Sequence, residues 1–302
     1  MAAVLVLAAC TSGTPSTQHH TGLFLLPMNR SAKPVEARIG SDPVAVIVSD
    51  DGATAYVADS APGDVYAVGL PALRVQWRAH TGGNPFGLLL HDGHLYVSLF
   101  SGAAVVELDP ATGRQTASHK VTAGPGMVSL DPSGDVIVAG TRGEIDYLDG
   151  RSVPAGHGYA VAIGGPGLDE MWTADYERAE LVRAGDLHNV GLPMPLFPFW
   201  LAPYLGGQIL VAAEGPSEDQ DLGGVFVFEP STEKWSTLAL VRDPDQAVFD
   251  ASGVTYVAAH GDRMVLTIYG GEVAKEAIGV PAVALAPDPN LAVVVVVEND
   301  RE

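Results

Sequence analysis

Three residues that can bind a metal or move a proton occupy the same place in similar stretches of sequence. Glu214, His260 and Glu298 end the apolar stretches "QILVAAE", "VTYVAAH" and "AVVVVVE". Two carboxylates and an imidazole can hold a divalent cation such as Ca²⁺ or Zn²⁺, or can act as a general acid–base group. The alternative is that each side chain makes a local hydrogen bond or faces water. These residues are the metal candidates.

The stretches that position these residues form a series along the chain. Its members are "TAYVADS" (54–60), "HLYVSLF" (94–100), "DVIVAGT" (135–141), "EMWTADY" (170–176), "QILVAAE" (208–214), "VTYVAAH" (254–260) and "AVVVVVE" (292–298). Their β-branched, aromatic and small residues indicate buried strands. A strand-only repeat of roughly 40 residues is typical of propeller blades with four strands each.

Each such strand belongs to a longer unit. An apolar strand and a glycine-containing turn precede it, and a third strand and a more polar fourth strand follow it. Residues 281–298 contain only a first and a second strand, and residues 21–40 read as a third and a fourth. We therefore predict an all-β fold, a seven-bladed β-propeller of four-stranded blades closed by pairing N-terminal and C-terminal strands in one split blade. Residues 21–302 would form this single domain.

The loops that lead into first strands and out of second strands lie on one face of a propeller, around the central mouth. Ligands commonly bind there. Besides the metal candidates, this placement predicts the ligand-binding residues Asp59, Asn84, His157, Asp175, Tyr176, Trp200, Asp245 and Gln246. Phe100 and Thr141 occupy the position of Glu214 in other units, and so mixed a set favours binding over catalysis.

Two further stretches are weaker candidates. Residues 214–224 hold Glu218, Asp219 and Asp221, which can chelate Ca²⁺ but lack the spacing of an EF-hand loop, so a solvated loop is the preferred interpretation. The apolar stretch 192–200 either forms a partner or ligand surface or supplies core aromatics beneath a long connection.

The amino-acid composition restricts the classes of partner that the protein can bind. The 302 residues include 36 acidic and 16 basic side chains, which gives a formal net charge of −20. Nucleic-acid affinity rests on Lys and Arg contacts to phosphate, so a nucleic-acid partner is excluded. No nucleophile elbow, phosphate-binding loop, Cys pair or zinc-protease motif is present. We expect a monomer with no certain cofactor, which binds a small ligand or a protein at the propeller face.

The start of the chain resembles a bacterial lipoprotein signal. The apolar run "AAVLVLAAC" ends at Cys10, the single cysteine, and the polar stretch "TSGTPSTQHHTG" follows. The resemblance implies a signal segment over 1–9, a lipid on Cys10 and a flexible tether over 10–20. No basic residue precedes the apolar run, which departs from the usual signal. The protein is thus expected outside the cell membrane and anchored to it, in the periplasm or at the cell surface.

The repeats resemble those of YVTN-type propellers, the YncE-like and surface-layer proteins of bacteria. The resemblance lies in the patterns "P-x-G/A-x-x-x-(S/D)-x-x-G-x-x-Y-V-A" and "G-x-V-x-x-x-D-P-x-T-G" and covers residues 21–298. It implies the propeller fold, but that superfamily includes binders, lactonases and lyases. The expected function is a membrane-tethered module that binds a ligand or scaffolds a protein. The alternative is a metal-assisted hydrolase or lyase, lactonase-like, that uses the central mouth.

Overall fold

The computed structural model describes residues 21–27, 35–217, 221–288 and 292–297, the last of these as backbone only. The predicted signal segment, Cys10, the tether and the metal candidate Glu298 lie outside the described residues. So do Glu218 and Asp219 of the candidate Ca²⁺ loop. Among the described residues, no helix is long and apolar enough to cross a membrane.

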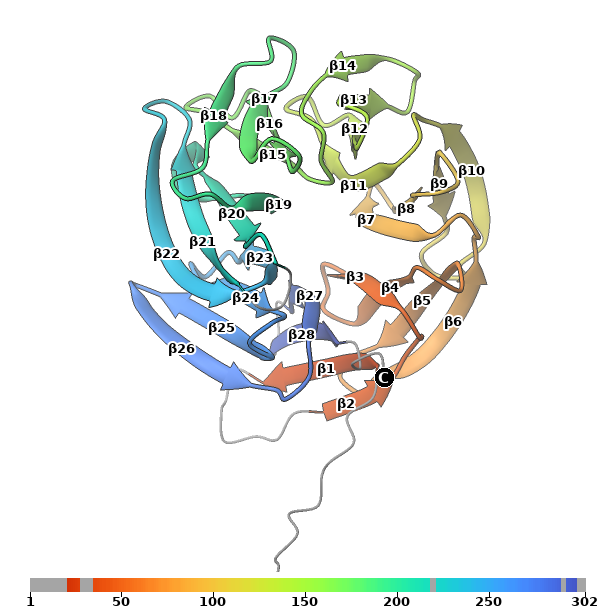
Figure 1. Ribbon diagram of the computed structural model, residues 1–302. Coiled ribbons are helices and arrows are strands. Elements are labelled where there is room, and N and C mark those ends of the chain that lie inside the picture. The colour runs from red at the N-terminus through yellow and green to blue at the C-terminus, as the bar shows by residue number, and fades with distance from the viewer. Residues whose placement is uncertain (1–20, 28–34, 218–220, 289–291, 298–302) are drawn as a thin grey trace, which may run out of the picture.

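The described strands form four-stranded antiparallel sheets around a central axis (Figure 1). Blade 1 comprises β3 (Pro43–Val48), β4 (Thr54–Asp59), β5 (Asp64–Gly69) and β6 (Arg74–His80). Blade 2 comprises β7 (Pro85–His91), β8 (His94–Leu99), β9 (Ala104–Leu108) and β10 (Gln115–Lys120). Blade 3 comprises β11 (Pro125–Leu130), β12 (Val136–Gly140), β13 (Glu144–Tyr147) and β14 (Ser152–Pro154).

The second half of the chain continues in the same way. Blade 4 comprises β15 (Val161–Gly164), β16 (Glu170–Asp175), β17 (Glu180–Arg183) and β18 (Asn189–Gly191). Blade 5 comprises β19 (Phe197–Pro203), the short helix η1 (Leu205–Gly207), β20 (Ile209–Glu214), β21 (Leu222–Glu229) and β22 (Lys234–Arg242). Blade 6 comprises β23 (Pro244–Phe249), β24 (Thr255–Ala259), β25 (Met264–Tyr269) and β26 (Glu272–Ala277).

The remaining sheet is composite, with the strand order β2-β1-β28-β27. It joins β1 (Gly22–Pro27) and β2 (Val35–Arg38) from the start of the chain to β27 (Ala282–Pro287) and β28 (Ala292–Val297) from its end. β1 pairs antiparallel with β28, so the predicted pairing of the two ends is present. Six blades are thus complete in one stretch of chain. The predicted count of seven is reached only when the composite sheet is included as a seventh four-stranded sheet.

Strand burial follows the expected gradient from the axis to the rim. The predicted second strands are buried, as in β4 and β20, whose small and β-branched residues pack between neighbouring sheets. The fourth strands β6, β10 and β26 are largely exposed. The predicted strands are confirmed, although β14 and β18 are shorter than the other fourth strands.

Hydrophobic clusters between adjacent sheets form the core. Trp172 and Leu181 of blade 4 pack with Leu201 and Phe226 of blade 5, for example, and all four are almost inaccessible to solvent. Equivalent clusters join the composite sheet to blade 1 and to blade 6. Burial of this apolar surface is the main force that holds the ring closed.

Candidate functional site

A β-bulge near the start of the first strand directs one residue of a blade toward the axis. The register shifts between Pro43 and Ala45 in β3, and the same irregularity recurs between Pro198 and Trp200 in β19 and between Pro244 and Gln246 in β23. A bulge leaves one residue unpaired and turns its side chain. These central positions are therefore filled by Val44, Phe86, Phe199, Asp245 and Val283, all of which line one cavity.

This central cavity has a volume of about 400 Å³, within the range of small-molecule sites. Its walls come from the first strands of five blades and from β27. Asp245 and Gln246 are the only polar side chains among the lining residues, and the rest of the wall is apolar. Trp200 also lines it, although its Nε1 is shielded from solvent and finds no acceptor among the described residues.

Four aromatic side chains form a continuous aromatic row beside the cavity: Phe86, Phe100, Tyr159 and Phe199. Ring centroids lie 5.5 Å apart for Phe86 and Tyr159 and 5.6 Å apart for Tyr159 and Phe199. Blade 3 has Gly126 between them, and a Cβ there would lie 2.4 Å from the carbonyl oxygen of Tyr159. The glycine therefore permits aromatic residues of blades 2 and 4 to meet across blade 3.

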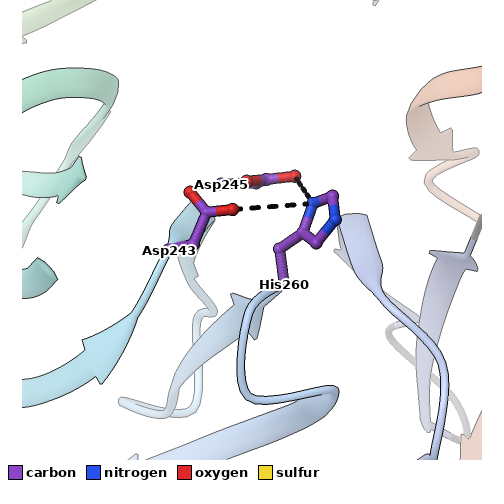
Figure 2. A group of neighbouring side chains, drawn as sticks. All are labelled: Asp243, Asp245 and His260. Carbon is purple, nitrogen blue, oxygen red and sulfur yellow. Dashed lines mark hydrogen bonds and ion pairs between the residues drawn. The ribbon is translucent and has the colours of Figure 1, made fainter. Parts of the chain in front are cut away.

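Blade 6 contributes the Asp–His cluster, which consists of Asp243, Asp245 and His260 (Figure 2). His260 Nδ1 lies 2.9 Å from Asp245 Oδ2 and 4.0 Å from Asp243 Oδ2. The His260 backbone N–H also donates to the Asp243 carbonyl at 2.9 Å, which fixes the two loops of the blade against each other. Asp243 is nearly buried, whereas Asp245 and His260 are partly open.

The cluster can perform acid–base chemistry or hold a cation. Asp245 can orient the imidazole through Nδ1, and Figure 2 shows Nε2 on the side of the ring away from both carboxylates. A histidine held this way can accept or donate a proton through Nε2. The three donor atoms also lie within 4.8 Å of one another, and two oxygens with one imidazole nitrogen suit a divalent cation.

The metal candidates are brought together only in part. His260 belongs to the Asp–His cluster, but Glu214 does not. Instead, Glu214 accepts a hydrogen bond from the Tyr176 hydroxyl at 3.0 Å. Equal positions in successive blades are separated by the rotation of the ring. In contrast, Asp245 lies in β23 of one blade, and Asp243 and His260 flank the paired residues Pro244 and Ala259 of the same blade. Asp245 was predicted as a ligand-binding residue but not as a partner of His260, and the β-bulge between Pro244 and Gln246 leaves it unpaired opposite β24.

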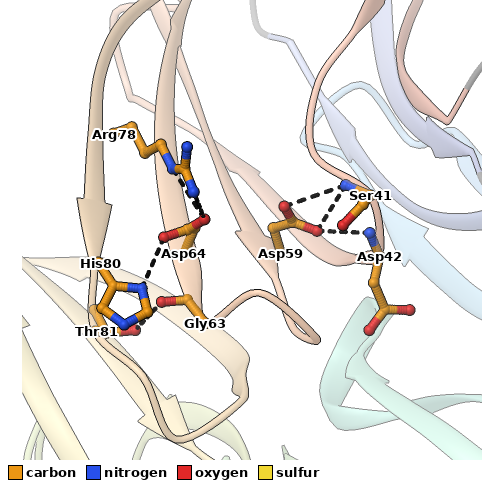
Figure 3. Close-up of polar contacts among 8 residues, drawn as sticks. All are labelled: Ser41, Asp42, Asp59, Gly63, Asp64, Arg78, His80 and Thr81. Carbon is orange, nitrogen blue, oxygen red and sulfur yellow. Dashed lines mark hydrogen bonds and ion pairs between the residues drawn. The ribbon is translucent and has the colours of Figure 1, made fainter.

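Two of the predicted mouth residues hold loops in place. The Asp59 carboxylate accepts the backbone N–H groups of Ser41 at 3.0 Å and Asp42 at 2.6 Å (Figure 3). Its side chain is almost fully buried, and burial raises its pKa even though the Asp42 and Ser41 hydrogen bonds lower it. Asp175 plays a similar part in blade 4, because it accepts the His157 backbone N–H at 3.2 Å and pairs with Arg178.

Asn84 and Gln246 are two more of the predicted ligand-binding residues that make hydrogen bonds within the propeller. Asn84 donates from Nδ2 to the Ser60 carbonyl at 3.1 Å and bonds the Ser101 hydroxyl, so it fastens a turn. Gln246 lines the cavity, and its Oε1 accepts the Leu285 backbone N–H of the composite sheet. Only Trp200, Asp245 and Gln246 of the eight predicted ligand-binding residues line the cavity.

Glu144 differs from Asp59 in the hydrogen bonding of its carboxylate. It begins β13, and its Oε1 lies 2.4 Å from where a Cβ of Gly140 would be. Gly140 pairs with Pro125 as Asp59 pairs with Pro43, so the Glu144 carboxylate occupies the space of the missing aspartate. Oε1 is buried and has no partner among the described residues. Burial, and then the charge of Asp146, raise the pKa of Glu144.

The weaker sequence candidates are also placed. Residues 197–200 of the apolar stretch belong to strand β19 and not to a connection. Phe199 and Trp200 line the cavity, and Phe197 packs on Tyr176. Its role as core and cavity wall therefore replaces the expected loop. In the candidate Ca²⁺ loop, Asp221 accepts the Ser217 backbone N–H at 3.1 Å.

Comparison with known proteins identifies the fold. A streptogramin B lyase structure matches with a TM-score of 0.70 and 11% identity, over 91% of this chain and 97% of that one. Virginiamycin B lyase from Staphylococcus aureus with quinupristin matches with a TM-score of 0.67 and 10% identity, over 91% and 98%. The periplasmic gluconolactonase of Pseudomonas aeruginosa matches with a TM-score of 0.65 and 13% identity, over 91% and 99%. No protein-family model and no curated protein matches the chain.

Proposed function

We propose that the protein is a binding module whose central cavity takes a small, mainly apolar ligand. Its structural neighbours are β-propeller proteins, and at such low identity they share the fold with this chain and not an activity. The observation that carries the proposal is the cavity of about 400 Å³ with two polar side chains in an otherwise apolar wall. Few placed polar groups in an apolar pocket are characteristic of small-molecule sites.

Filling the cavity tests this proposal. Val283 lines the cavity and is partly exposed within it, so Val283→Phe should occupy space that the ligand needs. Val273 on the outer strand β26 is 41% exposed, so Val273→Phe is the matched control. Binding of an apolar fragment library, measured by ligand-observed NMR, should fall in the first variant and persist in the control. Equal binding by both variants would overturn the proposal.

The Asp–His cluster favours a second candidate function, a metal-assisted lyase or hydrolase. His260 would act as the base that takes a proton from the substrate or from water, with Asp245 orienting its ring. Several neighbours are lyases or lactonases by name, and one is a catalytically inactive His-to-Ala variant of virginiamycin B lyase. A metal held by the two carboxylates would polarise the scissile group.

Thermal melting distinguishes a metal-assisted enzyme from a module that only binds an apolar ligand. A cation at a concentration 100 times its dissociation constant adds about 2.7 kcal/mol to the free energy of unfolding, so the melting temperature should rise by several degrees. Wild type, Glu214→Gln and His260→Ala are melted with EDTA and then with Ca²⁺, Mg²⁺ or Zn²⁺. If no ion raises the melting temperature of wild type above its value in EDTA, the cluster has no metal role.

We also propose that a lipid on Cys10 tethers the propeller outside the bacterial membrane, as a YVTN-type lipoprotein. The support is the sequence alone: small residues before a single cysteine and a Ser/Thr/Gly-rich stretch after it. Cys10→Ser should release the protein from the membrane fraction. A variant that still fractionates with membranes would contradict lipidation.

A further inference from the structure

We propose that the ligand of the central cavity is an organic cation, an alkylated ammonium group attached to an apolar body. This inference rests on the proposed binding function and adds the chemical class of the ligand. Two features of the cavity support it independently: the aromatic row and the carboxylate that blade 6 contributes to the wall.

Aromatic rings attract cations through the negative potential of their faces, and clustered rings are a common means of binding quaternary ammonium groups. Phe86 and Phe199 line the cavity, and Tyr159 contacts both. Phe100 extends the row, with its centroid 6.0 Å from that of Phe86. All four rings are partly exposed, so each has surface left for a ligand.

Charge on the cavity wall has one sign. Asp245 is the single ionisable side chain among the lining residues, and neither Lys nor Arg is among them. Asp243 and Asp245 place two carboxylates beside the single imidazole of His260. The whole chain carries −20, which adds a field that attracts cations and repels anions.

The apolar wall distinguishes an organic cation from a metal ion. A metal ion needs oxygen or nitrogen ligands and would use only the Asp–His cluster. An organic cation would use the carboxylate of Asp245, the ring faces and the remaining apolar surface together. Phe199 and Asp245 occupy the central positions of blades 5 and 6, which are neighbouring blades of the ring. One molecule of modest size can therefore contact both residues.

The test uses two probes of the same shape. Benzyltrimethylammonium carries a permanent positive charge, and neopentylbenzene has carbon in place of its nitrogen. Isothermal titration should show that the wild-type protein binds the cation about tenfold more tightly than the hydrocarbon, because the Asp245 carboxylate and the aromatic rings together attract a desolvated cation. Phenylacetate, which is aromatic and anionic, should not bind.

Two variants assign the preference to the proposed groups. Asp245→Asn should abolish most of the tenfold preference while neopentylbenzene binds as before. Phe199→Leu should lower the affinity for the cation more than the affinity for the hydrocarbon. Asp92→Asn is the control, because Asp92 is 85% exposed on the turn between β7 and β8, at the opposite end of the sheet. It removes the same charge from the chain and should change neither affinity.

The outcomes separate this inference from the proposed function. Equal affinity for the two isosteric probes would overturn the cation preference and leave an apolar binding site. Binding of neither probe, with no hit in the fragment screen, would overturn both. Displacement of benzyltrimethylammonium by stoichiometric Ca²⁺ or Zn²⁺ would make the Asp–His cluster a metal site and overturn the organic-cation assignment.

Discussion

Blade 1 and blade 6 each contain a group of two aspartates and one histidine, and the two groups have different roles. In blade 1, Asp64 is fully buried, accepts Arg78 Nε at 2.9 Å and lies 3.1 Å from His80 Nδ1 (Figure 3). Asp59 accepts backbone N–H groups of the loop before β3. In blade 6, Asp245 faces the cavity and contacts His260, which is 24% exposed (Figure 2).

The contrast shows that residue type does not distinguish a structural acid from a functional one. Buried carboxylates that are bonded to backbone N–H or Arg fix loops and strands, and their removal leaves unmet donors. A carboxylate on the wall of an apolar cavity can contact a ligand that binds there. We therefore expect blade 1 substitutions to change stability and blade 6 substitutions to change binding.

The largest expected effect is at Asp64. Asp64→Ala removes the acceptor of Arg78 and His80 and leaves a cavity between β5 and β6, so the free energy of unfolding should fall by about 3 kcal/mol. Because the side chain of Arg78 is 59% exposed, water can solvate it and the loss should not be larger. Urea denaturation measures the change, and a loss below 1 kcal/mol would contradict the structural role.

A smaller loss is expected at Asp59. Asp59→Ala leaves the N–H groups of Ser41 and Asp42 without their acceptor, at a cost of about 2 kcal/mol. Ala61 donates its N–H to Asp42, so the loop should loosen as a unit. Hydrogen exchange should show faster exchange at Ser41, Asp42 and Ala61. Unchanged exchange rates there would show that Asp59 does not hold the loop.

Glu144 tests the same comparison through pH. Burial raises its pKa above the ordinary value of 4.5, so ionisation costs more in the folded protein than in the unfolded chain. Wild type should lose stability as the pH rises from about 4.5 through the folded pKa, and no more above it. Glu144→Gln should thus gain less than about 1 kcal/mol at neutral pH and nothing in acid. Urea denaturation across this pH range measures the difference, and a gain that persists in acid would exclude ionisation as its cause.

Much of the fold follows from sequence because it rests on local patterns. Buried second strands such as 54–59 and 209–214 show in their β-branched and small residues, and glycine marks the turns before them. The incomplete units at the two ends predict the pairing of β1 with β28 because each lacks the strands that the other has.

The site was harder to predict because it depends on which side chains face the axis. Asp59 and Asp175 have the types expected at a mouth, yet both are buried against backbone. Asp245 was predicted from its place at the entry to a first strand, but the sequence does not reveal the bulge in β23 that leaves it unpaired opposite β24. Gly126, which brings Phe86 and Tyr159 together, has no side chain to signal its role.

The most direct measurement compares Asp64→Asn with Asp245→Asn in paired urea denaturation and benzyltrimethylammonium titration. Both variants remove one carboxylate charge and keep the shape of the side chain. We predict that Asp64→Asn loses stability and retains wild-type affinity, whereas Asp245→Asn unfolds within about 0.5 kcal/mol of wild type and loses most of its affinity for the cation. If Asp245→Asn binds the cation as wild type does, or if both variants lose affinity equally, Asp245 does not hold the cation and the functional contrast between the two blades is wrong.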